Sequence, residues 1–202
     1  MTDSRQCHWD EVYGTRAETD VSWFEATPGL SLDLVGRTKI APDAAIIDVG
    51  GGLSNLASAL VDAGHSDVTV LDISETAITR LDRRGGRIEG VAADITAWAP
   101  QRRYRVWHDR AVLHFLTEEE DRAAYKRALL AGLEPEGQAI IATFAPSGPE
   151  RCSGLPVRRY GREDLEAWLG DAFDMLESFE FDHLTPAGAV QRFHAARLQR
   201  RL

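Results

Sequence analysis

Residues that can do chemistry stand at the ends of short apolar runs in this sequence. Asp48 ends the run that begins at Ala44, and a glycine-rich turn over residues 50–52 follows it. Asp72 ends the next apolar run. Glycines let the backbone turn sharply and let a ligand approach closely, and an acid at the end of a second strand typically binds ribose hydroxyls. Together they predict a nucleoside site, with a purely structural turn and a solvated aspartate as the alternative.

The glycine turn also separates two classes of nucleoside cofactor. Dinucleotide sites usually carry G-x-G-x-x-G, with the pyrophosphate at a helix N-terminus. Here the segment 50–54 is followed by Asn55, so the last glycine of that pattern is missing. Asp48 would repel a pyrophosphate but tolerate the ammonium group of a methionine. S-adenosylmethionine is therefore favoured over a nicotinamide cofactor. A nicotinamide-dependent oxidoreductase is further disfavoured because no Tyr-x-x-x-Lys pair stands in the expected place.

A second group of candidates follows the apolar run 104–108. Asp109, Arg110 and His114 stand where the ligand crevice of a parallel sheet is expected. Asp109 or His114 can act as a general base if the acceptor arrives protonated. Arg110 can bind an acceptor carboxylate through two hydrogen bonds. The alternative for all three is a salt-linked loop without a catalytic role.

Short apolar runs alternate with amphipathic stretches from Ala44 onward, which is typical of βαβ units on a parallel sheet. Two strand-like runs, joined by a turn at residues 185–188, come last and indicate an antiparallel pair. We expect a single α/β domain with strands at 44–49, 68–72, 88–93, 104–108, 139–144, 175–181 and 190–198.

Capping residues and apolar spacing place the helices between these strands. Ser74 can cap one helix, and residues 117–120 form a capping box in which Glu120 reaches back to the cap amide. A helix that includes Leu53 should follow the glycine turn and end at Gly64. The segment 145–158, which contains Cys152, is predicted as a long loop, with an unremarkable thiol and a reactive one as alternatives.

The stretch from Ala44 to Phe144 resembles class I S-adenosylmethionine-dependent methyltransferases. Their first motif, an acid followed by spaced small residues, is matched by Asp48, Gly50, Gly52 and Ser54. The resemblance implies that Asp72, with Ile73 beside it, binds the ribose, and that Asp94 and Ile95 flank the adenine. It also implies a Rossmann-like three-layer sandwich with strand order 3-2-1-4-5-7-6.

A shorter stretch resembles particular branches of that superfamily. Residues 107–113 are similar to the W-D-R-G-A-L stretch of thiopurine S-methyltransferase relatives and to the W-D-K-G-T-L stretch of elongation-factor and citrate-synthase lysine methyltransferases. The resemblance implies methyl transfer with S-adenosylhomocysteine as product, and it adds Asp109 to the cofactor site. A small-molecule acceptor with a thiol or other soft atom is our first hypothesis. A protein lysine N-methyltransferase is the second, and a non-catalytic nucleoside-binding module is the third.

Residues 1–42 show no long regular pattern but are rich in aromatic side chains. We expect them to form a lid or cap, and residues 43–202 to form the methyltransferase domain. Trp23 is the best candidate to face the cofactor, because an aromatic ring suits a sulfonium group. The alternative is a flap that only packs on the sheet. Residues 9, 13 and 24 are the other aromatic positions of this segment.

The overall composition narrows the range of partners. A net charge of -9 argues against nucleic-acid binding, which needs a basic surface. No apolar run approaches the roughly 20 residues of a membrane helix, and the polar start of the chain does not resemble a signal peptide. Cys7 and Cys152 form no disulfide framework, so we expect a cytoplasmic protein. The histidines show no ligand spacing, so no metal is expected.

Overall fold

Seven strands form one mixed sheet in the order expected from the sequence. The computed structural model describes residues 2–202 and has the strand order β3-β2-β1-β4-β5-β9-β8. The last two strands are numbered 8 and 9 because a small hairpin precedes them. The strands are β1 (Ile46–Val49), β2 (Val68–Asp72), β3 (Ile88–Ala92), β4 (Tyr104–Arg110), β5 (Leu133–Phe144), β6 (Arg151–Cys152), β7 (Leu155–Pro156), β8 (Phe173–Leu184) and β9 (Val190–Arg200).

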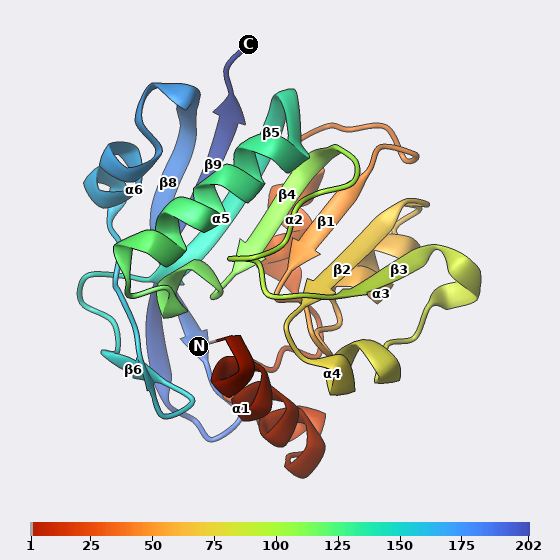
Figure 1. Ribbon diagram of the computed structural model, residues 1–202, viewed down its shortest axis with the longest axis vertical. Coiled ribbons are helices and arrows are strands. Elements are labelled where there is room, and N and C mark those ends of the chain that lie inside the picture. The colour runs from red at the N-terminus through yellow and green to blue at the C-terminus, as the bar shows by residue number, and fades with distance from the viewer. Residues whose placement is uncertain (1) are drawn as a thin grey trace.

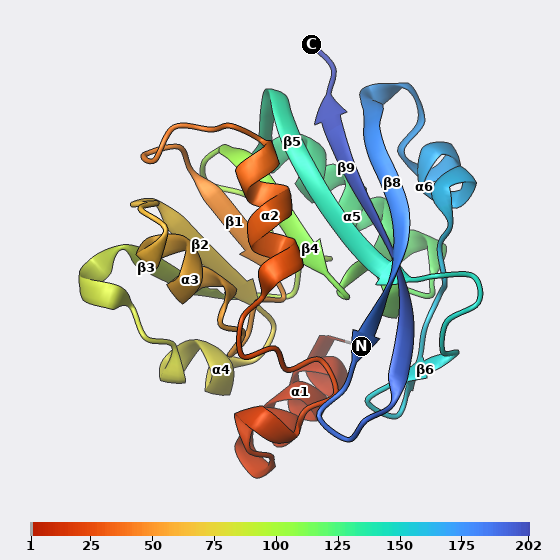
Figure 2. The same ribbon diagram turned by 180° about the vertical axis from the view of Figure 1, so that it is seen from behind.

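Helices cover both faces of the sheet, which gives three layers (Figures 1 and 2). On one face lie α5 (Glu119–Gly132) and α6 (Arg162–Leu169), and on the other lie α2 (Gly29–Arg37) and α3 (Leu56–Asp62). Side chains alternate along each strand, so Ile47 packs in the core under α5 while Ile46 packs in the core under α2 and α3. Strands β1 and β2 are buried along their whole length, as parallel central strands must be.

The first 42 residues are more regular than their sequence suggests. They contain α1 (Thr2–Thr15) as well as α2. Figure 1 shows α1 beside α4 (Glu75–Arg80), at the edge where the parallel strands end. Asp10 accepts hydrogen bonds from the Ser74 hydroxyl at 2.6 Å and the Thr76 amide at 3.0 Å. Arg80 donates to the Tyr13 carbonyl at 2.6 Å, so both ends of this contact are anchored.

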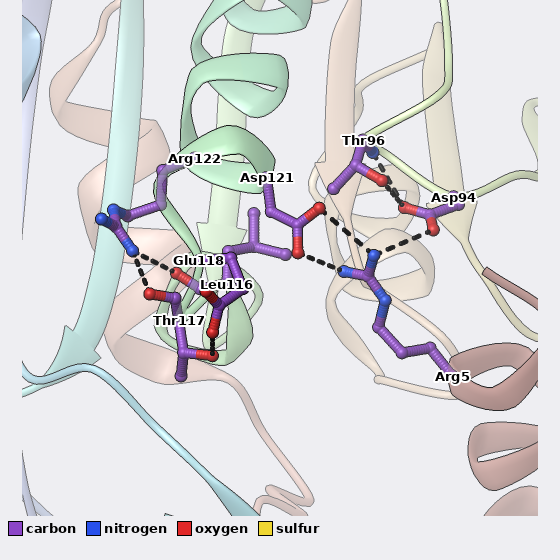
Figure 3. Close-up of polar contacts among 8 residues, drawn as sticks. All are labelled: Arg5, Asp94, Thr96, Leu116, Thr117, Glu118, Asp121 and Arg122. Atoms are coloured by element: carbon purple, nitrogen blue, oxygen red, sulfur yellow. Dashed lines mark hydrogen bonds and ion pairs between the residues drawn. The ribbon is translucent and has the colours of Figure 1, made fainter. Parts of the chain in front are cut away.

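Two predictions about helix starts are wrong. The helix predicted to start with a capping box begins at Glu119, with Glu118 as its N-cap and no side-chain cap. The Thr117 hydroxyl donates to the Glu118 carboxylate at 3.3 Å, and Arg122 binds the Thr117 carbonyl (Figure 3). Leu53 precedes α3, which begins only at Leu56 because the glycine turn extends further than expected.

Helix α4 is short, and its predicted cap at Ser74 is confirmed, because the Ser74 hydroxyl accepts the Ala77 amide at 3.1 Å. None of the helices in the described chain combines the length and the apolar character that crossing a bilayer requires. Single turns of 3-10 helix occur at Glu18–Asp20, Arg84–Gly86, Leu113–Phe115 and Gly170–Ala172.

Candidate active site

A cavity opens where the parallel strands end. Its volume is about 850 Å³ including the open mouth. The strand order places the residues that follow β2 and β3 at one side of β1, and the residues of β4 and β9 at the other. The first side contributes Asp72, Ile73, Asp94 and Ile95, and the second contributes Arg110, Phe115, Cys152, Gln191 and Phe193.

Asp72 stands at the floor of the first side. One of its carboxylate oxygens accepts the Ser74 amide at 2.8 Å, and the residue is only 4% exposed. Burial raises the pKa of Asp72 to about 7. Asp72 lines the cavity, and its carboxyl group can therefore contact a ligand bound there.

Asp94 presents an acceptor atom to the same side. Its Oδ1 accepts the Thr96 amide at 2.8 Å and the Thr96 hydroxyl at 2.7 Å, whereas its buried Oδ2 has no hydrogen bond. Arg5 approaches that oxygen at 3.8 Å and binds Asp121 of α5 at 3.2 Å (Figure 3). Ile95 lines the cavity next to Asp94. An acidic acceptor with an apolar wall suits a purine that carries an amino group.

Asp48 lies beneath the glycine turn and outside the cavity lining. Its Oδ1 is 2.7 Å from Nδ1 of His108, and Nε2 of His108 is 3.0 Å from the Ser31 hydroxyl of α2. All three side chains are buried. Asp48 does not line the cavity, and its contact with a methionine ammonium stays a prediction. His108, which sequence reasoning passed over, holds this carboxylate in place.

The glycines of the turn are required by the protein's own side chains. Gly50 and Gly52 have φ values of 69° and 48°, in the left-handed region. A Cβ on Gly50 would lie 1.9 Å from Val112, and a Cβ on Gly52 would lie 2.1 Å from the Tyr13 hydroxyl. Ser54 is exposed and accepts the Leu56 amide at 3.0 Å just before α3, and it does not line this cavity.

Aromatic side chains from the first 42 residues cover the cavity. Trp23 lines it together with Trp9 and Tyr13. The ring of Trp9 lies 5.8 Å from that of Trp23 and 5.1 Å from that of Phe115, both edge to face. Trp23 and Tyr13 also line a second cavity, of about 450 Å³ with its mouth.

Of the three predicted catalytic residues, only Arg110 reaches the cavity. Asp109 is fully buried and accepts hydrogen bonds from the Val112 and Leu113 amides and, at 2.6 Å, from the Tyr125 hydroxyl. Burial raises its pKa to about 6. The carboxylate thereby shapes the turn after β4, and it does not line the cavity.

His114 lies behind the cavity wall. It is fully buried between the rings of Phe115 and Phe144, with centroids 4.4 and 4.7 Å away. Burial, and to a lesser extent the charge of Arg110, lowers its pKa to about 3. A neutral, enclosed imidazole of this kind is a poor general base at neutral pH.

Arg110 is already engaged by the protein. It donates to the Trp23 carbonyl at 3.0 Å and lies 3.3 Å from the Glu25 carboxylate. Its Nη2 is 3.2 Å from Nδ1 of His183, whose Nε2 donates to the Ser22 carbonyl at 2.7 Å. Arg110 therefore ties the segment that carries Trp23 to the end of the sheet, and most of its donors are not free for an acceptor carboxylate.

Cys152 lies in the cavity wall because the β6–β7 hairpin, predicted as loop, carries it there. Burial raises the pKa of this thiol to about 11, so it stays protonated at neutral pH and the unreactive alternative is favoured. Sequence reasoning also missed Arg5, Gln191 and Phe193, since only the folded chain brings α1 and β9 to the cavity. No group of three or more metal-ligating side chains occurs within residues 2–202.

Residues 46–137 match the family model of a methyltransferase domain. This match supports the resemblance to methyltransferases, and the matched stretch contains the glycine turn, Asp72 and Asp94.

The chain is similar to known proteins over different lengths. It is 29% identical over 122 residues to the eEF1A lysine and N-terminal methyltransferase of Mus musculus. That match covers 56% of this chain and 17% of the relative, so the chain spans less than a fifth of the length of that protein.

Solved structures match the fold over almost the whole chain. The 1,6-didemethyltoxoflavin-N1-methyltransferase of Burkholderia thailandensis, solved with S-adenosylhomocysteine, has a TM-score of 0.71 and 19% identity, over 99% of this chain and 85% of the other. A SAM-dependent methyltransferase of Anabaena variabilis has a TM-score of 0.75 and 13% identity, over 99% and 95% of the two chains. At these identities the structural matches establish the Rossmann-like methyltransferase fold.

Proposed function

We propose that this domain transfers a methyl group from S-adenosylmethionine to a small-molecule nucleophile. One observation carries the proposal: two buried carboxylates, Asp72 and Asp94, line one side of a cavity at the ends of parallel strands. Adenosine offers hydroxyl and amino donors on a flat apolar ring, and these groups complement two acceptors beside Ile73 and Ile95.

Each part of the cofactor has a counterpart among these residues. Asp72 would bind the ribose, and the unsatisfied Oδ2 of Asp94 would accept from the adenine amino group. Bound S-adenosylmethionine supplies a methyl group on a positively charged sulfur. The ring of Trp23 suits that charge and would shield it from water.

The lid assignment belongs to the same proposal. Residues 1–42 would act as the lid and residues 43–202 as the catalytic domain. In support, α1 and the segment that follows it place Trp9, Tyr13 and Trp23 on the cavity. Methyl transfer needs chiefly in-line positioning, so a lid that fixes both reactants supplies much of the catalysis.

A small acceptor is favoured by the enclosure of the site. The acceptor side is bounded by the β6–β7 hairpin, β9 and the lid, so an acceptor would have to fit between these elements. A protein lysine N-methyltransferase is the second candidate, because the relative from Mus musculus carries that activity in its name.

Calorimetric titration tests the proposal directly. The purified chain should bind S-adenosylmethionine and S-adenosylhomocysteine but not NADH, and Asp72→Asn should weaken that binding by at least about tenfold, the effect of roughly 1.4 kcal/mol. Binding of NADH alone would contradict the proposal. Binding without methylation of either small acceptors or lysate proteins would favour a non-catalytic nucleoside-binding module.

A further inference from the structure

Helix α1 is attached to different parts of the domain near its two ends. Near the C-terminal end, the Asp10 carboxylate and the Tyr13 carbonyl bind residues at the start and the end of α4. The buried side chains of α1, Val12 and Tyr13, also lie near that end. At the other end, Arg5 reaches across to α5 (Figure 3). Arg5 and the ring of Trp9 thus attach the N-terminal half of the helix.

The contact between Arg5 and Asp121 of α5 is an ion pair with two points of attachment. Nη2 of Arg5 donates to Oδ1 of Asp121 at 3.3 Å, and Nη1 lies 3.2 Å from Oδ2. The two side chains are 26% and 27% exposed, so the pair is partly shielded from water. Two parallel contacts fix the plane of a guanidinium group better than one. Asp121 therefore sets where Arg5 lies, although Asp121 itself does not line the cavity.

Arg5 stands at the end of the cavity proposed for the adenine. It lines the cavity together with Asp94 and Ile95. Its Nη2 is 3.8 Å from Oδ2 of Asp94, which is close enough for charge attraction but too long for a hydrogen bond. The guanidinium group offsets the cost of burying this carboxylate, and Oδ2 keeps its capacity to accept from an amino group. The ion pair between Arg5 and Asp121 can therefore stay formed while a nucleoside occupies the cavity.

We propose that Arg5 and Asp121 form a latch that holds the N-terminal half of α1 over the nucleoside end of the cavity. Opening of this latch limits the rates at which the cofactor enters and leaves. The inference rests on the proposed function and adds Asp121 as a positioning residue. Arg5 and Trp9 line the cavity, so movement of this half of the helix uncovers the nucleoside end. The contacts of Asp10 with α4 stay in place and form the hinge.

Asp121→Asn tests the inference, because it removes one charge of the latch without changing the cavity lining. Calorimetry first establishes that the full chain binds S-adenosylhomocysteine. Stopped-flow tryptophan fluorescence, which reports on Trp9 and Trp23 in the cavity wall, then measures the association and dissociation rates. Both rates should rise about threefold to fivefold, the effect of a partly exposed ion pair, while the dissociation constant changes less than about twofold. A variant that merely damaged the site would instead raise the dissociation constant.

Two further variants separate the latch from general effects of charge. Glu120→Gln removes the same charge from the neighbouring, exposed position of α5 and should leave both rates unchanged. Arg5→Gln should raise both rates at least as much as Asp121→Asn does. The double variant with Arg5→Gln and Asp121→Asn should be no faster than Arg5→Gln alone, because the same contact cannot be lost twice.

The outcomes separate the two proposals. Failure of S-adenosylhomocysteine to bind overturns both the proposed function and the inference. Normal cofactor binding overturns the inference alone if Asp121→Asn leaves both rates unchanged or raises only the dissociation rate. Equal acceleration by Glu120→Gln, or additive effects in the double variant, also overturns the inference, because the rates would then not depend on the pair of Arg5 and Asp121.

Discussion

At the scale of single residues, burial decides which acids can serve the cofactor. Asp72 and Asp109 are both buried and both have a raised pKa. The carboxylate oxygens of Asp109 accept hydrogen bonds from the Tyr125 hydroxyl and from backbone amides, whereas Asp72 faces the cavity. Two aspartates that look alike in the sequence therefore have different roles, one shaping a turn and the other available to a ligand.

The raised pKa of Asp72 predicts proton-linked cofactor binding. With a pKa of about 7, the carboxyl group is partly protonated near neutrality, and ribose hydroxyls favour its ionised, acceptor-only form. Cofactor affinity should rise as pH increases from 6 to 8, with release of up to one proton. Calorimetry at pH 6.5 in two buffers of different ionisation enthalpy measures this release, and Asp72→Asn should abolish it. A wild-type protein that releases no proton would exclude this role.

The backbone conformation of Ala111 predicts that glycine at this position would stabilise the protein. It follows β4 with a φ of 81°, a left-handed conformation that costs an L-residue with a side chain about 1 kcal/mol. The W-D-R-G-A-L stretch that residues 107–113 resemble has glycine at this position. Ala111→Gly should raise the free energy of unfolding by about 0.5 kcal/mol, after allowing for the greater freedom of glycine in the unfolded chain. Urea denaturation measures the change, and Ala41→Gly, which has no positive φ, should show no gain.

At the scale of elements, α1 is positioned by its contact with α4. Asp10 binds the hydroxyl of Ser74 and the amide of Thr76 at the N-terminus of α4, where backbone donors lack helical partners. Because α1 carries Arg5, Trp9 and Tyr13, this contact sets how three lining residues meet the cavity. The β6–β7 hairpin does the same for Cys152 from the opposite side.

Loss of the Asp10 contact should loosen α1 selectively. Asp10→Ala should speed amide hydrogen exchange in residues 2–15 by about fivefold, equivalent to about 1 kcal/mol for a lost cap, while β1 and β4 keep their protection. Exchange followed by mass spectrometry reports each segment. Glu11→Ala, an exposed position on the same helix, is the matched control. Equal loosening in the two variants would mean that Asp10 does not anchor the helix.

At the scale of the whole molecule, buried titratable groups link stability to pH. His114 has a folded pKa of about 3 against 6.5 for an unperturbed histidine, because burial penalises the charged ring. Its contribution to stability is complete above pH 6.5 and is lost as pH falls toward 3. The raised pKa values of Asp72 and Asp109 favour the folded chain as pH falls, which is the opposite of the effect of His114. The effect of His114 on stability must therefore be isolated with a variant.

His114→Gln removes the titrating group and should change the pH dependence of stability. At pH 7.5 the variant should be less stable than the wild type, because it buries an amide among rings. The difference in free energy of unfolding between the two proteins should shrink as pH falls to 5, because the unfolded wild-type chain then binds a proton that the folded chain excludes. Urea denaturation at both pH values measures the two free energies. A difference that is the same at both values would contradict the lowered pKa.

The sequence alone determined the βαβ pattern and Asp72, and the resemblance to class I methyltransferases added the strand order and Asp94. Apolar strands and the glycine turn depend on local spacing, so Asp72 could be placed from the chain itself, whereas Asp94 was placed by the resemblance. The tertiary structure decided the rest. Whether Asp48, Asp109 or His114 reaches a ligand depends on burial and on partners distant in the chain, such as His108 and Tyr125, and spacing carries no information about such contacts.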